Sequence, residues 1–299
     1  MRIKKIIVFL LVSTPFFSFC QYNLEFGIGA GGANYLGEIG GREKNARPFV
    51  TDMHLEQTRL AGSFFVRYRF APEFHVKLAL SVLQIAGNDK LSINPGRAGR
   101  NLEFQNNIHE LALTGQFNFY NAYDIFRAIR KKRRIDYSIY AFGGGAGFYH
   151  NPKARYADRL LELRPLMTEG QSKPYNRYEF AIPMGIGMHY TIRKQHRIGF
   201  EFGWRLTFTD YLDDISTNYA SPEQLKDPLA IKMANRRNEL SGDPGIPSHI
   251  YYEPGQKRGD PTNNDSYFVA LVTYSILFRD RNIYYRSNYY NVGRRKMRF

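Results

Sequence analysis

The chain is poor in three features that would assign it to common classes of protein. It has one cysteine, Cys20, so no disulfide can form within one chain. Beyond the first 20 residues there is no run of about 18 apolar residues, which excludes a membrane-spanning helix there. Acidic residues number 27 against 42 Lys and Arg, so the net charge is +15. Aromatic residues are common at 15%, a composition that suits β-strands with aromatic membrane girdles.

Residues 1–20 have the pattern of a secretory signal peptide. The first residues are basic, an unbroken apolar run follows at 6–12, and small residues stand three and one positions before Gln21. We predict cleavage before Gln21, which leaves a mature chain without cysteine. A lipidated Cys20 is the alternative, although Phe19 is bulky where lipoprotein signals have a small residue.

The strongest pattern in the chain lies at 178–210, where two stretches alternate strictly between large apolar residues and small or charged ones. A period of two predicts β-strands with one apolar face. In a soluble sandwich the large residues would face inward, and the small polar face would lie outside. A membrane barrel instead directs its large residues to lipid and keeps a polar lumen. The pattern therefore favours a membrane barrel over the alternative, a secreted soluble β-protein.

The same alternation occurs in six further segments, at 22–32, 58–70, 74–85, 108–120, 136–149 and 266–278, although the faces of 136–149 are hard to tell apart. Each segment is long enough for a tilted strand to cross a bilayer, which takes about 9–11 residues. We predict an all-β fold, an eight-stranded antiparallel transmembrane β-barrel over residues 21–278.

The connections between these strands alternate in length. Long connections are expected at 33–57, 86–107, 150–177 and 211–265, and shorter ones at 71–73, 121–135 and 193–197. Outer-membrane barrels have short periplasmic turns and long external loops. We therefore predict an outer-membrane location, four long external loops, both termini in the periplasm and a basic periplasmic tail at 279–299.

Most of the positive charge falls on the predicted periplasmic segments. The net charge is +4 for 121–136, +3 for 193–197 and +6 for the tail. Such a field attracts acidic protein faces or anionic lipid headgroups, and both alternatives stay open. Nucleic acid is not expected, because an exported barrel does not meet it. The residues predicted to dock a partner are Arg127, Arg130, Lys131, Lys132, Arg133, Arg134, Arg279, Arg281, Tyr284, Tyr285, Arg286, Arg294, Arg295, Lys296 and Arg298.

Strand parity directs several charged side chains into the lumen. An eight-stranded barrel is filled by side chains or holds one small ligand, so a conducting pore is not expected. Unpaired charges there would each cost several kcal/mol, on the order of a buried ion's desolvation penalty. We predict a paired network, with a proton relay or catalytic carboxylate pair as the alternative. Its predicted members are Glu25, Arg67, Lys77, Glu110, Glu179, Glu201 and Arg205.

Asp210, Asp213 and Asp214 precede Ser216 and Thr217 where the seventh strand enters the last long loop. Oxygen ligands close in sequence suit calcium, but their spacing does not match the twelve-residue calcium loop. Asx and Ser/Thr turns that end the strand explain the cluster equally well.

An enzyme at the external rim, acting on lipid or peptide, is a further alternative. His150 and His249 are available to it, yet no Ser-His-Asp arrangement is visible in the sequence. We predict no enzyme activity, no catalytic residues, no metal and no cofactor.

Several strings resemble a known family. They are residues 25–27 leading through 34–38, 148–152, 182–187 followed by 199–205, and 209–217, which is the most specific. Together they resemble the Bacteroidetes outer-membrane barrel family that includes PorG, the accessory barrel of the type IX secretion system. The motif residues are Asn34, Tyr35, Gly37, Glu38, Thr209, Asp210, Tyr211, Asp213, Asp214, Ser216 and Thr217.

This resemblance implies an eight-stranded outer-membrane barrel without catalytic residues. For PorG-like members it implies association with a periplasmic ring, made of a lipoprotein and its soluble partner, beneath the secretion translocon. The family includes members of unassigned role, and the tail matches no family motif. We therefore expect a non-enzymatic barrel that docks this ring, with an external-rim enzyme or a purely structural small barrel as alternatives.

Overall fold

The computed structural model describes residues 24–39, 55–71, 73–123, 136–193, 195–240 and 252–278. The predicted signal peptide and its cleavage site lie outside this part of the chain. So do His249 and all the residues predicted to dock a partner, which fall within 127–134 and 279–298.

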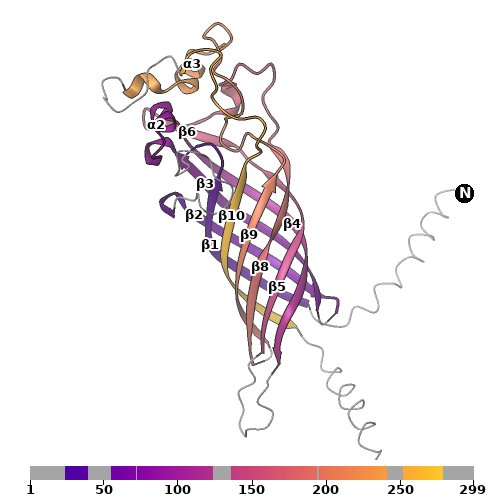
Figure 1. Ribbon diagram of the computed structural model, residues 1–299. Coiled ribbons are helices and arrows are strands. Elements are labelled where there is room, and N and C mark those ends of the chain that lie inside the picture. Colours follow the sequence, from indigo (N-terminus) through magenta and orange to yellow (C-terminus); the bar gives the residue numbers. More distant parts are fainter. Residues whose placement is uncertain are drawn as a thin grey trace, which may run out of the picture.

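Eight long antiparallel strands form a closed barrel (Figure 1). They follow one another in the order β3-β2-β1-β10-β9-β8-β5-β4, and pairing of β3 with β4 closes the ring. The predicted fold is confirmed. The strands are β1 (Leu24–Leu36), β2 (Arg59–Arg69), β3 (Phe74–Asn88), β4 (Glu103–Tyr123), β5 (Asp136–Tyr149), β8 (Tyr178–Ile192), β9 (His196–Thr207) and β10 (Ser266–Phe278).

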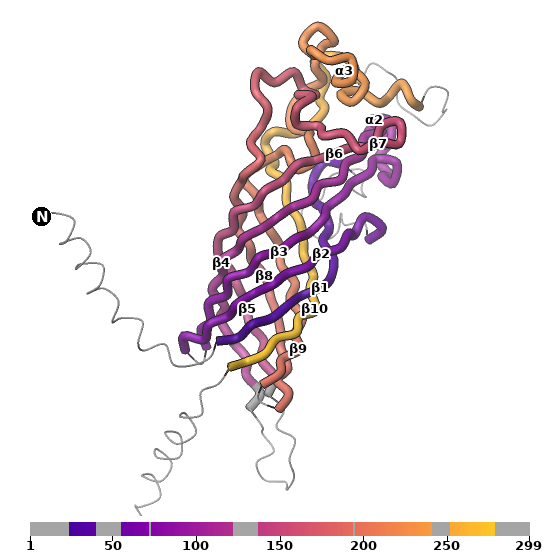
Figure 2. The backbone as a smooth tube through the Cα atoms, turned by 180° about the vertical axis from the view of Figure 1, so that it is seen from behind, coloured from indigo at the N-terminus to yellow at the C-terminus, as the bar shows by residue number. Residues whose placement is uncertain are grey.

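The barrel has two different ends. At one of them, here called the short-turn end, Tyr123 pairs with Asp136 and Leu24 pairs with Phe278. The opposite end, here called the long-loop end, carries the long connections with their short helices, at the top of Figure 1 and, seen from behind, of Figure 2. All long connections thus gather at one end, which is the arrangement that the alternation in length predicts.

The long connections contain regular structure of their own. The hairpin of β6 (Pro152–Tyr156) and β7 (Arg159–Glu162) adds to the edge of β4 through Gln105 and Asn106. The helices are α2 (Pro95–Arg100), α3 (Pro228–Ala234), η3 (Leu55–Gln57), η4 (Asp89–Leu91), η5 (Arg164–Leu166) and η6 (Arg237–Leu240). Among the described residues no helix is long and apolar enough to span a membrane, a finding that concerns helices only.

Three strands are longer than the sequence predicts, and all three extend at the long-loop end. β1 continues to Leu36, while β3 and β4 stay paired as far as Asn88 and Glu103. In the extensions of β1 and β3 residues of both faces are buried or partly buried, so large and small residues do not alternate. Cross-strand backbone hydrogen bonds nevertheless hold these strand extensions together. The long connections continue from the extended strand ends.

The outer face of the barrel is apolar. Ile28, Leu80, Leu113 and Val272 are about half exposed or more, at 60%, 56%, 56% and 60%. Their neighbours along each strand, such as Ser81, point inward and are buried. Exposed apolar side chains around a closed barrel form a belt that suits lipid hydrocarbon. The inversion of large and small faces that the sequence indicates is therefore present in the structure.

The ambiguous strand β5 has two distinct faces. Tyr140, Ala146 and Phe148 are buried inside the barrel. The alternate positions Gly143 and Gly145 are exposed on the outside. The sequence pattern is weak here because the outward positions in the middle of the strand, from Ala141 to Gly147, carry little or no side chain.

An apolar core lies at the long-loop end. Ile85, Ile108, Leu212 and Ile215 are at most 1% exposed and belong to one buried cluster. Leu212 and Ile215 come from the last long connection, whereas Ile85 and Ile108 come from β3 and β4. The core therefore fixes this loop on the mouth of the barrel.

Candidate functional site

Two buried polar clusters define the candidate site, one in the lumen and one at the long-loop mouth. In the lumen, Glu201 of β9 stands at the centre of the first cluster. Its carboxylate accepts hydrogen bonds from Arg67 Nη2 at 3.0 Å and Tyr140 Oη at 2.6 Å, and it forms an ion pair with Lys77. Because β2 and β3 lie across the barrel from β9, these contacts cross the lumen.

Glu25 of β1 extends the same network. It pairs with Arg67 Nη1 at 2.7 Å and Arg197 Nη1 at 2.5 Å, and Ser275 Oγ donates to it at 2.5 Å. Arg67 thus bridges Glu25 and Glu201, and all of these side chains are buried. A bridged, hydrogen-bonded arrangement offsets the cost of taking the charges out of water.

A second group lies nearer the long-loop end of the lumen. Arg205 Nε is 3.4 Å from Glu110 Oε2, and Tyr267 Oη donates to the same oxygen at 2.7 Å. Glu179 does not join either group: it is only partly buried, and its side-chain hydrogen-bond partner is Asn176. Its inward position is at the rim of β8, where parity alone does not ensure burial.

Arg197 and Tyr140 are network members that sequence reasoning missed. Arg197 was assigned to a periplasmic turn, but β9 begins at His196, so Arg197 shares the inward face with Glu201. This correction lowers the basic excess expected of the turn 193–197 by one. Extending the alternation of β9 back by two residues would have found Arg197. No such signal existed for Tyr140, because the faces of β5 are hard to distinguish.

At the mouth, the strings 34–38 and 209–217 of the family resemblance meet. Tyr35 Oη donates to Asp265 Oδ1 at 2.5 Å, and the backbone N–H of Glu38 donates to Tyr35 Oη at 3.2 Å. The other oxygen of Asp265 accepts from the backbone N–H of Leu212 at 2.9 Å. Asp265 therefore ties the end of β1 to the segment 209–217.

Turns within 209–217 use their own side chains. Thr209 Oγ1 accepts from the backbone N–H of Tyr211 at 3.2 Å, and Asp213 Oδ1 accepts from that of Ile215 at 2.9 Å. These contacts are the Ser/Thr and Asx turns that the sequence offers as one reading of the acidic cluster. Of the other motif positions, Asn34 donates through Nδ2 to Thr58 Oγ1 at 3.0 Å, and a Cβ at Gly37 would lie 2.3 Å from Asp265 Oδ1.

Asp214 connects 209–217 to the long connection after β5. Its carboxylate accepts from Thr168 Oγ1 at 2.5 Å and Tyr175 Oη at 2.9 Å, and Arg258 Nη1 donates to its backbone oxygen at 2.7 Å. Asp214 itself adopts a positive φ of 71°. The carboxylate therefore has a structural role in joining loops.

Glu169 has a similar role in joining loops, through Ser216 and Thr217. Its Oε1 accepts from Arg258 Nη1 and the backbone N–H of Ser216, both at 2.9 Å. Its Oε2 accepts from the backbone N–H of Thr217 at 3.0 Å and from its Oγ1 at 2.8 Å. Ser216 and Thr217 are thus donors to a carboxylate from a distant loop.

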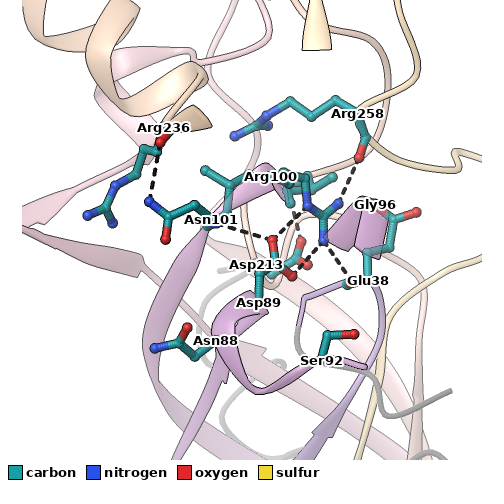
Figure 3. Close-up of polar contacts among 12 residues, drawn as sticks. Glu38, Asn88, Asp89, Ser92, Gly96, Arg100, Asn101, Asp213, Arg236 and Arg258 are labelled. Carbon is teal, nitrogen blue, oxygen red and sulfur yellow. Dashed lines mark hydrogen bonds and ion pairs between the residues drawn. The ribbon is translucent and has the colours of Figure 1, made fainter. Parts of the chain in front are cut away.

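Arg100 of α2 holds three connections together (Figure 3). It pairs with Asp89 through Nε at 2.8 Å, and its Nη2 and Nη1 donate to the backbone oxygens of Glu38 and Arg258, each at 2.8 Å. Asn101 continues the contacts by donating to the backbone oxygen of Arg236 at 3.2 Å. Burial of Arg100 excludes competing water from all these bonds.

Carboxyl groups at the mouth are crowded, and their pKa values reflect it. Burial raises the pKa of Asp210 to about 7, and the negative charges of Glu38 and Glu169 add to this shift. Burial also raises the pKa of Asp214 to about 6, although Arg258 opposes the shift.

Asp213 and Asp265 are almost completely buried near one another. Burial raises the pKa of both well above its usual range, and the charge of Asp213 raises that of Asp265 further. Burial also raises the pKa of Glu38, against the opposing charge of Arg100. The arrangement therefore favours carboxyls that keep protons, since repulsion between neighbouring carboxylates is relieved when one is neutral.

Two observations concern the alternatives of a metal site and of an enzyme at the external rim. Within the described ranges, no group of three or more His, Cys, Asp and Glu side chains is arranged to bind a metal ion. His150 is fully buried and stacks on Tyr175, with ring centroids 6.0 Å apart. Burial lowers the pKa of His150 to about 4, so it stays neutral at physiological pH.

Four residues of the mouth cluster were not found from the sequence: Arg100, Glu169, Arg258 and Asp265. Each lies in a long connection without periodicity, and its partners are distant in sequence. The one local signal is at Asp265, which directly precedes β10.

The sequence model of one protein family, described as a domain of unknown function (DUF6089), matches residues 2–227. No curated protein matches the chain.

Solved structures with a similar fold include three bacterial barrels. The attachment invasion locus protein Ail of Yersinia pestis, in complex with the heparin analogue sucrose octasulfate, has a TM-score of 0.38 at 8% identity, covering 86% of this chain and 99% of Ail. The N-terminal barrel of Pseudomonas aeruginosa OprF has a TM-score of 0.34 at 10% identity, and the match covers 86% of this chain and 98% of the OprF barrel. OprG of the same organism has a TM-score of 0.35 at 10% identity, and the match covers 87% of this chain and 98% of OprG.

Proposed function

We propose that this protein is a non-enzymatic outer-membrane barrel that docks a periplasmic assembly. The chain belongs to the DUF6089 family, whose description assigns no activity. The assembly that we propose is the ring of the type IX secretion system, formed by a lipoprotein and its soluble partner. In this proposal the short-turn end faces the periplasm, both termini lie there, and the barrel is an accessory component rather than the secretion channel.

One observation carries the docking proposal: the two most basic segments join the barrel at the same end. The segment 124–135 has six basic residues and one acidic, and 279–299 has seven and one. Their flanking residues Tyr123, Asp136 and Phe278 are all at the short-turn end. Positive charge concentrated on one side attracts an acidic partner and orients its approach.

The lumen network supports an accessory role over that of a channel. Arg67, Glu201 and Lys77 join strands on opposite sides of the barrel through buried ion pairs. At the other end the loops are held on the mouth by Arg100 and the apolar core. A barrel filled in this way suits a membrane anchor with a working surface outside its lumen.

The link to type IX secretion rests on the resemblance of the strings at 34–38 and 209–217. In the structure these strings meet at the mouth, through Tyr35, Asp265 and Leu212, and serve as loop contacts. They therefore support membership of a barrel family and a shared mouth architecture. The pathway itself needs a functional test.

The test removes the basic segments one at a time. Deleting 280–299, or replacing the six basic residues of 124–135 with Gln, should abolish co-purification with the ring components and lower secretion of type IX cargo. Either variant keeps all eight strands, so it should still show the folded form on unheated gels. Binding by the unmodified protein should weaken with added salt, since exposed charges are screened over about 8 Å at physiological ionic strength.

A matched control removes charge from the opposite end. Lys173 and Lys226 are exposed in the long connections, so replacing both with Gln should leave association unchanged. Association and secretion that survive loss of both basic segments would contradict the docking proposal. An external-rim enzyme predicts the reverse result, in which the segments are dispensable and Asp210→Asn or Asp214→Asn abolishes function.

A further inference from the structure

The outer face of the barrel is interrupted by an apolar groove where β3, β4 and β5 meet. A cavity of about 620 Å³ opens there, toward the short-turn end. Its lining includes Phe70, Phe74, Val76, Gly115, Phe117 and Gly143. A volume of this size is within the range of about 300–1,000 Å³ that is usual for ligand pockets.

The floor of the groove is backbone. Gly115 of β4 lies directly opposite Gly143 of β5, and both are exposed on the outer face. A Cβ at either position would have no neighbouring atom closer than 3.9 Å. By contrast, a Cβ at Gly27 or Gly187 would lie 2.3 Å from Phe65 or 2.5 Å from Tyr140.

Packing within the chain therefore explains Gly27 and Gly187 but not Gly115 and Gly143. Glycine inside a strand is destabilising relative to alanine, because it has more conformational freedom to lose on folding. Gly145, the next outward residue of β5, likewise has nothing within 4 Å of a Cβ position. The outer face of β5 therefore stays open beside the groove as well.

The walls of the groove are large apolar side chains. Phe74 and Phe117 face each other with ring centroids 5.0 Å apart and remain 55% and 44% exposed. Beside the groove, outside its lining, β8 places the exposed side chains of Met184 and Ile186 opposite Gly143 and Ala141. The result is a trough bounded by side chains and floored by glycine.

We propose that this groove seats one acyl chain of a membrane lipid. The groove is continuous with the apolar belt, so the medium that meets it is hydrocarbon. Its lining offers no exposed charge that could bind a polar headgroup or form an ion pair with a protein partner. A long flexible hydrocarbon fits a trough of apolar walls and makes dispersion contacts along the whole floor.

The proposal is tested by filling the groove. The purified full-length protein is equilibrated with palmitoyl-oleoyl phosphatidylethanolamine in mild detergent, and retained lipid is counted by native mass spectrometry. The wild type should retain a lipid. Gly143→Leu should lose it, because the leucine side chain occupies the floor. Ala141→Leu is the second variant, should Gly143→Leu fail to give the folded form on unheated gels.

Gly62→Leu is the matched control. Gly62 is an exposed glycine on the outer face of β2 and is outside the groove. Its surroundings are equally open, since a Cβ at this position would lie 3.9 Å from the nearest atom. This variant should retain lipid like the wild type. Equal retention by Gly143→Leu and wild type would overturn the proposal, as would equal loss from Gly62→Leu.

A photo-crosslinking residue at Phe117 identifies the occupant in native envelopes. A lipid-sized adduct that disappears with Gly143→Leu supports the proposal. A protein adduct that disappears with the same variant would overturn it in favour of a partner's membrane segment.

Discussion

The lumen network and the mouth cluster bury ionisable groups in two different ways. In the lumen, Glu201 and Glu25 each contact two cationic side chains, and Arg67 serves both. At the mouth, Asp210 and Asp213 lie among other carboxyls, whose charges raise their pKa values further. Charge is balanced by pairing throughout the lumen network. At the mouth, protons retained by Asp210 and Asp213 act beside the ion pairs of Arg258 with Glu169 and of Arg100 with Asp89.

The difference follows from what surrounds each region. Lumen side chains belong to strands whose register is fixed by backbone hydrogen bonds, so each carboxylate can meet a cation across the barrel. At the mouth, Asp265 accepts from the hydroxyl of Tyr35 and the backbone N–H of Leu212, whereas Glu169 combines backbone N–H contacts with an ion pair to Arg258. The two regions should therefore respond differently to loss of a partner and to pH.

The largest effect is expected from breaking the lumen network at its centre. Glu201→Gln removes the charge that Arg67 and Lys77 share, and leaving a buried cation uncompensated costs about 3–5 kcal/mol. Urea unfolding of the protein in lipid vesicles measures this loss of stability.

Glu179→Gln is the control with identical chemistry. Glu179 is also in a barrel strand and faces inward, but it is only partly buried and outside the network. We expect a change within about 0.5 kcal/mol. Similar losses for both variants would mean that burial in the network is not what distinguishes Glu201.

A smaller effect is expected at the mouth from Tyr35→Phe. The change removes the hydroxyl that donates to Asp265 Oδ1 and leaves a buried carboxyl oxygen without this donor, at a cost of about 1–3 kcal/mol. Hydrogen exchange of the segment 209–217 should increase. In Tyr137→Phe the lost hydroxyl has only the sulfur of Met188 at 3.6 Å, so this control should change little. Unaltered exchange in Tyr35→Phe would show that Asp265 is held by its other contacts.

The most diagnostic effect concerns pH. The folded pKa values of Asp210 and Asp214, about 7 and about 6, exceed the ordinary aspartate value of 3.8. Between these values the folded state binds more protons than the unfolded state, so stability should decrease as pH rises from about 4 to about 7. Hydrogen exchange of 209–217 should therefore be slower at the acidic end, after correction for intrinsic rates.

Asp210→Asn should reduce this pH dependence, because it removes the group with the higher pKa of the two. Greater protection of the mouth at pH 8 than at pH 5 would contradict the argument that its carboxyls keep protons. It would make the mouth resemble the lumen, with charges stabilised by their partners.

Alternation predicted most of the barrel and part of its site. Successive side chains of a strand point to opposite faces, so Glu25, Arg67 and Glu201 could be assigned to the lumen from parity alone. The same rule misplaced Arg197, because the start of β9 was set two residues late, and it gave no guidance for Tyr140 in the glycine-rich β5. Strand ends and weak faces limit this inference.

The sequence by itself determined the number of strands, their inward and outward faces and the gathering of long connections at one end. These properties follow from a local period of two and from loop length. Only the tertiary structure decided that Arg67 meets Glu201, 134 positions away, and that Asp265 meets Tyr35, 230 positions away. Such contacts depend on the closure and register of the whole barrel and on loops without periodicity, which no local pattern encodes.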